Sequence, residues 1–312
     1  MRQAAPRPVG PAVADAVLRP VVARIRQVPD RYREFVQTVR DAAWEHRLDH
    51  TLLERFTDLG LPCRGGPDGP RYDRLDLANA SLALRLPSAR SMAMRGWANT
   101  LRATAGSAAT TFEVEIRPRC PAPGHPGECA YEASAALRAQ PGFTESPDGH
   151  RYLVRDRIVA PDTDVPQEVR DLAALVSPLH YHLLPEELRG DIGFARETNL
   201  ADCALAVALL VAEATLRGIT ARPSFGFLLA VPYSIEHAWT EVEFDGRQVS
   251  LDPHLLNLLT SWDLLERDQW PSHQPISACT WRLGGHKAHP VLHHGAGSML
   301  SLATVIKVDM AA

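Results

Sequence analysis

The sequence predicts an α+β fold in which helices come first and antiparallel strands follow. Two observations support this prediction. Residues 203–217 form a segment that is apolar on nearly every side, which is typical of a buried central helix. Further along the chain, two strand-like segments meet at Asp245-Gly246, the strongest two-residue signal for a β-hairpin. Helical and strand-like segments are therefore grouped rather than alternating, and this favours α+β over α/β.

The first part of the chain has mostly helical patterns. Residues 1–12 are rich in Pro, and we expect them to be loosely structured. Residues 13–108 form the predicted helical N-terminal region, because apolar residues recur there at near-helical spacing. The Gly- and Pro-rich stretch 62–70 interrupts this pattern and is expected to be a loop or hinge, and Pro87 marks a second break.

Residues 109–312 are predicted to form one catalytic domain. Alternating apolar residues predict strands early and late in this region, and near-helical spacing predicts helices before and after the hairpin. The expected strands are 111–116, 151–159, 278–283 and 299–308, and the expected helices besides 203–217 are 165–176, 186–195 and 255–266.

Composition excludes several classes of function. The 312 residues have a net charge of −4 at pH 7, so nothing in their charge favours binding to nucleic acid or to an acidic membrane. No stretch reaches the ~18 apolar residues of a membrane span. The N-terminus lacks the apolar core of a signal peptide, and the five cysteines are an odd number. We therefore expect free thiols and a cytoplasmic protein.

Cys203 is the candidate nucleophile. The preceding residues suggest the start of a helix, with Thr198 or Asn199 as its cap and Asp202 in its first turn. Gly218 is expected to end the helix. Cys203 would then lie in the first turn, where the helix dipole and unpaired N–H groups favour a thiolate. The alternative is an inert cysteine of the core, the commoner fate of a cysteine in an apolar helix.

His237 and Asp252 are the candidate base and its orienting carboxylate. A two-residue turn at Asp245-Gly246 places Phe244 opposite Arg247, so positions that sum to 491 are paired and Asp252 shares a face with His237. A three-residue loop would turn Asp252 to the other face. The alternatives are a strand histidine satisfied by solvent or backbone and an Asp-Pro turn. Together with Cys203, the two residues complete the set of a thiol enzyme: nucleophile, base and orienter.

Four further residues are candidates for lining the site. Asn199 could help to hold an oxyanion, although a helix cap is the more expected role for it. His180 and His182 lie some twenty residues before Cys203 and could contact substrate. Trp239 would share a strand face with His237 and could shelter the reacting pair, or could simply pack.

Two groups of residues have metal-ligating side chains. The first group is Cys120, His125 and Cys129, and the second is His286, His289, His293 and His294. The spacing of the first group matches no standard zinc pattern and shows no evident fourth ligand, so we expect a Pro/Gly surface loop and no metal. The second group is flanked by Gly and Pro and is expected to be a solvated or substrate-side loop.

Residues 199–253 resemble the core of the transglutaminase-like superfamily. The resemblance is carried by Asp202-Cys203-Ala204 with its following helix, by the Arg-Gly-Ile-Thr-Ala-Arg step at 217–222, by Glu236–Val242, and by Leu251-Asp252-Pro253. Order, spacing and flanking residues agree over about 55 residues. One departure is Asp202, where the family often has a small residue such as glycine. Residues 1–160 carry no such resemblance.

The resemblance implies a papain-like α+β fold and a covalent acyl-thioenzyme mechanism. Cys203, His237 and Asp252 stand where the family has its nucleophile, its histidine and its aspartate. The superfamily contains crosslinking enzymes, peptidases, amidases, acyltransferases that use carrier-bound thioesters, and inactive binding members.

The expected function is therefore acyl transfer to an amine through an acyl-thioenzyme, without a cofactor. The acyl donor would be an amide or a thioester, possible donors including an acyl chain on a carrier protein, in the biosynthesis of a small molecule or peptide. The alternatives are hydrolysis of the same intermediate by a peptidase or amidase, and an inactive binding module. The three residues are common to transfer and hydrolysis, which differ in water exclusion and amine binding.

Overall fold

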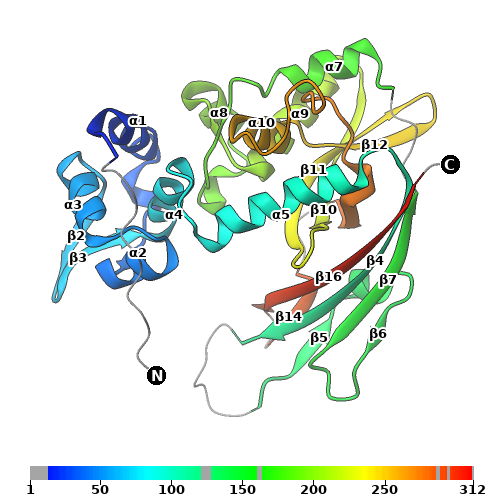
Figure 1. The fold of residues 1–312 in the computed structure, drawn as a ribbon, viewed down its shortest axis with the longest axis horizontal. Coiled ribbons are helices and arrows are strands. Elements are labelled where there is room, and N and C mark those ends of the chain that lie inside the picture. The colour runs from blue at the N-terminus through cyan, green and yellow to red at the C-terminus, as the bar shows by residue number, and fades with distance from the viewer. Residues whose placement is uncertain (1–12, 121–127, 160–163, 286–288, 294–295, 311–312) are drawn as a thin grey trace. The chain divides into compact units, whose positions relative to one another are not determined.

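The computed structural model describes residues 13–120, 128–159, 164–285, 289–293 and 296–310 (Figure 1). It is a mixed α and β protein whose larger sheets are antiparallel, as the sequence predicted. The chain divides into two units, Met1–Ser91 with Leu183–Pro185, and Met92–His182 with Glu186–Ala312.

The first unit packs helices against a small sheet with the strand order β1-β3-β2. Side-chain oxygens begin three of its helices: Thr38 caps α2, Asp49 caps α3 and Asp73 caps α4. Its core includes Leu18, Leu53 and other apolar residues of these helices. Its elements are α1 (Asp15–Ile25), η1 (Asp30–Tyr32), β1 (Phe35–Gln37), α2 (Val39–Glu45), α3 (His50–Asp58), β2 (Cys63–Gly66), β3 (Gly69–Asp73) and α4 (Arg74–Ala83).

The stretch 62–70 is a β-hairpin, so the prediction of a loop or hinge was wrong. Strands β2 and β3 pair antiparallel, with Gly66 opposite Gly69. Gly69 has a φ of 114°, a backbone conformation open mainly to glycine. The strand β2 is Cys-Arg-Gly-Gly and is mostly exposed, so it lacks the alternation of apolar and polar residues by which strands are recognised.

The second unit contains the remaining helices and strands. Helix α5 begins at the end of the first unit and runs into the second. The helical elements are α5 (Ala89–Thr104), α6 (Ala135–Arg138), α7 (Gln167–Ala174), η2 (Glu186–Leu188), α8 (Ile192–Thr198), α9 (Cys203–Leu216), α10 (Pro253–Ser261) and η3 (Ser277–Cys279). The strands are β4 (Ser107–Arg119), β5 (Tyr131–Ala133), β6 (Thr144–Glu145), β7 (Tyr152–Val159), β8 (His180–Tyr181), β9 (Leu200–Ala201), β10 (Thr220–Leu228), β11 (Ile235–Phe244), β12 (Arg247–Leu251), β13 (Thr280–Gly284), β14 (Val291–His293), β15 (Ala296–Gly297) and β16 (Met299–Met310).

In the described part of the second unit, the strands form four sheets. Their strand orders are β12-β11-β10-β13, β16-β4-β7-β6, β15-β14-β5 and the parallel pair β8-β9. Helix α9 packs against β10 and β11, and helices α7, α8 and α10 pack against α9, so these helices form one group beside the first sheet (Figure 1). Helix α9, which begins at Cys203, is therefore packed on an antiparallel sheet.

The chain divides after Ser91, whereas the predicted boundary was at residue 108. The reason is that most of helix α5 packs within the second unit. Within the second unit, Arg102 donates a hydrogen bond to the carbonyl oxygen of Leu264 at 2.7 Å, and the backbone N–H of Val231 donates to Thr100 Oγ1 at 3.4 Å. The buried residues Met94, Trp97 and Leu101 give helix α5 an apolar side. The helical pattern of residues 89–104 was recognised, but its packing partners lie more than a hundred residues away.

The hairpin at Asp245-Gly246 has the predicted register. Phe244 lies opposite Arg247 and Thr240 lies opposite Leu251, so paired positions sum to 491. Asp245 and Gly246 have φ values of 49° and 69°, as a type I′ turn requires. On one face Val242, Val249 and Leu251 pack with residues next to and within α7.

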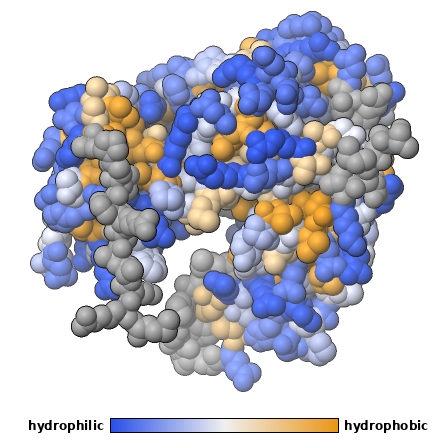
Figure 2. Space-filling view, in the orientation of Figure 1, coloured by the Kyte–Doolittle hydropathy of each residue, from blue (hydrophilic) through white to orange (hydrophobic). Residues whose placement is uncertain are grey.

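The surface seen in Figure 2 is largely hydrophilic, with hydrophobic side chains gathered in places, including near β16. Exposed large hydrophobic residues on or beside this strand are Val305 and Tyr233, the latter bridged to Ala303. Among the described residues, no helix combines the length and hydropathy needed to cross a membrane.

Candidate active site

Cys203 is the first residue of helix α9 and is partly exposed. The prediction that it lies in the first turn is confirmed, but the predicted cap is wrong. Asp202 is the N-cap, and its Oδ1 accepts a hydrogen bond from the N–H of Leu205 at 3.1 Å. The helix starts later than expected because Thr198 ends α8 and the strand β9 intervenes. Gly218, with a φ of 69°, follows the C-cap as predicted.

His237 and Asp252 form a buried pair. His237 Nε2 lies 2.5 Å from Asp252 Oδ2, and both residues are only 4% exposed. The other carboxylate oxygen, Oδ1, accepts the N–H of Leu255 at 2.8 Å, since Asp252 is also the N-cap of α10. Both oxygens of this carboxylate are therefore engaged, and the imidazole ring is held in one orientation.

The thiol of Cys203 completes the set. Burial by itself lowers the pKa of His237, but the Cys203 sulfur and Asp252 raise it, through charge and through hydrogen bonds, to about 10. Because Nε2 faces Asp252, Nδ1 is the ring nitrogen left for the sulfur. The arrangement favours a thiolate paired with an imidazolium, which is the reactive form of a cysteine nucleophile.

The start of α9 can also stabilise negative charge on a substrate oxygen. The first N–H groups of a helix have no acceptor within the helix, and the helix dipole is positive at this end. Asp202 accepts the hydrogen bond of the Leu205 N–H. The N–H groups of Cys203 and Ala204, at the first two helical positions, are then the ones that can donate to a substrate oxygen. Backbone donors beside a nucleophile are the usual components of an oxyanion hole.

Asp202 is itself neutralised. It is 3% exposed, and its Oδ2 accepts a hydrogen bond from Arg189 Nε at 2.8 Å. This ion pair offsets the negative charge that Asp202 would otherwise place beside a thiolate. The residue that departs from the family pattern therefore has two structural contacts, one to the helix and one to Arg189.

We expect Asp202→Ala to lower the free energy of unfolding by about 1–2 kcal/mol, because the helix cap is lost. Asp202→Asn should lower the free energy of unfolding by only a few tenths of that amount, because Asn caps a helix about as well as Asp. Urea unfolding of both variants measures the difference. Arg189→Gln, which removes only the ion pair, is the matched control. An equal loss for the Asn and Ala variants would show that the ion pair, and not the cap, stabilises this corner.

The strand before the nucleophile is clamped through one carbonyl group. The oxygen of Ala201 accepts the backbone N–H of His182 at 2.8 Å and the His254 Nε2 proton at 2.9 Å. His254 is buried, which lowers its pKa and keeps it neutral, with the proton on Nε2. Tyr181 stacks on its ring at 5.5 Å between centroids. These contacts position the backbone two residues before the sulfur.

Two buried tryptophans enclose the imidazole region. Trp97 of α5 is 1% exposed, and its ring centroid lies 6.2 Å from that of His237. Trp239 is fully buried, two residues from His237 on the same strand. Among the described residues, neither indole nitrogen has a hydrogen-bond partner. Such buried rings limit the access of water to the reacting groups.

The other predicted lining residues lie beside β9. Asn199 is exposed and is the C-cap of α8 in a left-handed conformation, with a φ of 56°, so it does not cap α9. Its carbonyl oxygen accepts the N–H of His180 at 2.7 Å. His180 is exposed on β8, whereas His182 is 4% exposed and follows it.

Sequence reasoning missed three residues around the site: Trp97, Arg189 and His254. Trp97 and Arg189 carry no local signal, because Trp97 reaches the site from α5 and Arg189 from the turn after η2. His254 could have been found, since it follows the Asp252-Pro253 pair directly and is the second residue of α10.

The candidate metal residues are divided between described and undescribed parts of the chain. Cys120, Cys129 and His293 are described, and their ligand atoms lie within 4.8 Å of one another. His289 is exposed. The remaining candidates, His125, His286 and His294, lie outside the described residues.

Comparison of the sequence with protein-family models and with curated proteins found no match.

Proposed function

We propose that the protein is a cysteine-dependent acyltransferase with a papain- and transglutaminase-like core, and that it forms an amide through an acyl-thioenzyme. The observation that carries the proposal is the buried imidazole of His237, bound to Asp252 on one side and interacting with the sulfur of Cys203 on the other. The order of the three residues and the motifs around them agree with the family pattern described above.

In the first step, the thiolate of Cys203 attacks the carbonyl carbon of an amide or thioester. Negative charge moves to the carbonyl oxygen, where the N–H groups at the start of α9 stabilise it. His237 gives its Nδ1 proton to the leaving amine or thiol as the bond to carbon breaks. The acyl group is then bound to the sulfur as a thioester, and His237 is neutral.

In the second step, a primary amine attacks the thioester carbon. Neutral His237 removes a proton from the amine nitrogen, and the sulfur leaves as a thiolate. The products are an amide and the starting thiolate–imidazolium pair. Asp252 keeps the ring oriented and stabilises its protonated form throughout the cycle.

Burial favours transfer over hydrolysis. His237 is 4% exposed, the buried ring of Trp97 lies near it, and Trp239 is buried two residues further along the same strand. A reaction that must deliver the acyl group to an amine benefits from a site that limits water. The proposed donors are thioesters, including those on carrier proteins, and activated amides, and the proposed setting is the cytoplasm, where cysteines remain free thiols.

Trapping of the acyl group tests the proposal. The whole protein is incubated with short-chain N-acetylcysteamine thioesters and with a glutamine peptide, with and without a primary amine. Intact mass and peptide mapping should show an acyl adduct on Cys203 that disappears when amine is added, with amide as the main product. Cys203→Ser is the control. Acid as the main product would instead indicate a hydrolase. The absence of any Cys203 adduct would contradict acyl transfer.

A further inference from the structure

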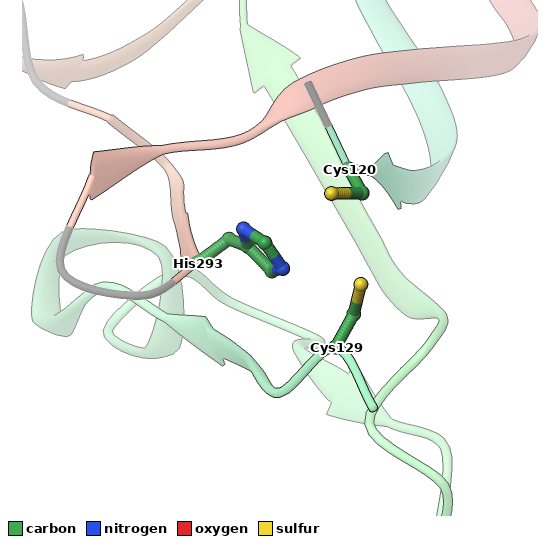
Figure 3. A group of neighbouring side chains, drawn as sticks. All are labelled: Cys120, Cys129 and His293. Carbon is green, nitrogen blue, oxygen red and sulfur yellow. The ribbon is translucent and has the colours of Figure 1, made fainter. Parts of the chain in front are cut away.

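The second unit contains a group of metal-ligating side chains that the proposed reaction does not use. Cys120, Cys129 and His293 each offer one ligand atom, and these three atoms lie within 4.8 Å of one another. Figure 3 shows the two sulfur atoms and the imidazole ring turned toward a common space. Cys203, His237 and Asp252 come from other elements, α9, β11 and the start of α10.

The sheet register brings these residues together. Cys120 follows the last residue of β4, and Cys129 stands two residues before β5. His293 ends β14, which pairs with β5 so that His293 lies opposite Tyr131. The rings of His293 and Tyr131 contact each other, with centroids 5.0 Å apart. The imidazole is therefore placed by strand pairing and by an aromatic neighbour, although it is 164 residues from Cys129 in sequence.

The chemistry of this donor set selects a class of metal. Two thiolates and one imidazole are soft to borderline ligands, which suit Zn²⁺ and related transition metals and do not suit Mg²⁺ or Ca²⁺. In a tetrahedral zinc site with Zn–S bonds of about 2.3 Å, neighbouring sulfurs are roughly 3.8 Å apart. Atoms within 4.8 Å of one another need to move by only about 1 Å to reach that geometry.

The burial of the three residues and the reduced state of the two cysteines also fit a zinc site. His293 is 5% exposed, and the two cysteines are partly buried, so a bound ion would be shielded by protein on the side of the imidazole. Among the described residues, neither cysteine forms a disulfide. Deprotonated thiols this close together repel one another, and a divalent cation between them removes that repulsion.

We propose that Cys120, Cys129 and His293 bind one zinc ion, which ties the segment after β4 to the strand pair β5 and β14. The described residues supply three of the four positions of a tetrahedral ion. The role is structural: the ion joins the segment after β4 to β5 and β14, two short strands that pair over three residues. This inference is independent of the proposed acyl transfer.

Metal content and cobalt substitution test the site directly. Wild-type protein, produced with zinc and purified under reducing conditions, should contain about one zinc per chain by elemental mass spectrometry. Replacing zinc by Co²⁺ should produce a thiolate-to-cobalt charge-transfer band and the strong visible bands of tetrahedral cobalt. X-ray absorption should show two sulfur ligands at about 2.3 Å.

Variants identify the ligands. Cys129→Ser and His293→Ala should each lower zinc occupancy at least tenfold, while Cys63→Ser, which removes an exposed cysteine of the first unit, should leave it unchanged. Zinc removal from the wild type should lower the melting temperature and leave the alkylation rate of Cys203 within twofold. That wild-type measurement holds even if a ligand variant fails to fold.

Two results would overturn the proposal. One is reduced, folded wild-type protein that contains no zinc and gives no charge-transfer band with Co²⁺. The other is a Cys120–Cys129 disulfide in protein purified under the same reducing conditions, detected as a mass two hydrogens lower and a crosslinked peptide.

Discussion

Replacing His237 by alanine should slow the alkylation of Cys203 by iodoacetamide at pH 6 by on the order of 10²-fold. The thiolate is the reactive form, and without a cationic partner a cysteine has a pKa near ~8.5, so only about one molecule in 300 is ionised at pH 6. In the wild type, the Cys203 sulfur raises the pKa of His237, and the proposed pairing with this imidazolium should favour the thiolate. Intact-mass spectrometry over time measures both rates.

The pH profile gives a second readout of the same pair. Contacts with Cys203 and Asp252 outweigh burial and raise the pKa of His237 to about 10, so the ring stays protonated through neutral pH. The stabilisation from this pair is fully present below the ordinary histidine pKa of about 6.5 and is lost as the pH rises through about 10. Wild-type alkylation should therefore change little between pH 6 and 9, whereas the alanine variant should speed up about tenfold per pH unit up to ~8.5.

The other cysteines supply internal controls. Cys63 is exposed and should react as an ordinary thiol in both proteins. Cys279 is buried, which raises the pKa of its thiol to about 12, so it should stay unlabelled in the folded protein. If Cys203 of the wild type reacts no faster than Cys63 at pH 6, the paired thiolate does not exist, and the catalytic proposal fails with it.

Replacing Asp252 by asparagine should lower the proposed acyl transfer by about 10⁴-fold, the loss seen when the orienting aspartate of a catalytic triad is changed in this way. The carboxylate accepts from His237 Nε2 at 2.5 Å, and an amide in its place removes the charge that stabilises the imidazolium. We therefore expect the pKa of His237 to fall in this variant. NMR titration of ¹³C-labelled histidine measures it.

Asparagine and alanine separate the two contacts of Asp252. Asn can still cap α10 by accepting the N–H of Leu255, whereas Ala cannot, so Asp252→Ala should be less stable than Asp252→Asn by about 1 kcal/mol. Both variants lose the charge, so both should lose activity. A variant with asparagine that retains wild-type transfer and an unchanged His237 pKa would contradict the role of Asp252 as orienter.

Much of the candidate site could be predicted because its signals are local. Asp245-Gly246 selects a two-residue turn, the turn determines which residues face each other, and Asp252 is thereby placed on the side of His237. The apolar segment from Cys203 to Gly218 likewise marks one buried helix with the cysteine at its start.

The predictions of the helix cap and of the loop at 62–70 were wrong because the local signals there were ambiguous or weak. Thr198, Asn199 and Asp202 are all good caps, and the prediction wrongly chose Thr198 or Asn199 and placed Asp202 in the first turn. The choice fell to Asp202 because the short strand β9 pairs with β8 and separates the two helices. The hairpin at 63–73 was missed because glycines and exposed residues give no alternation.

By itself, the sequence determined the α+β class, the apolar segment that forms the Cys203 helix and the register that joins His237 to Asp252, because helical period, strand period and turn type are properties of neighbouring residues. Only the tertiary structure decided that Trp97 lies against His237, that Arg189 neutralises Asp202, and that His293 meets Cys120 and Cys129. The physical reason is that these contacts depend on how distant segments pack, and packing leaves no periodic trace in the segments themselves.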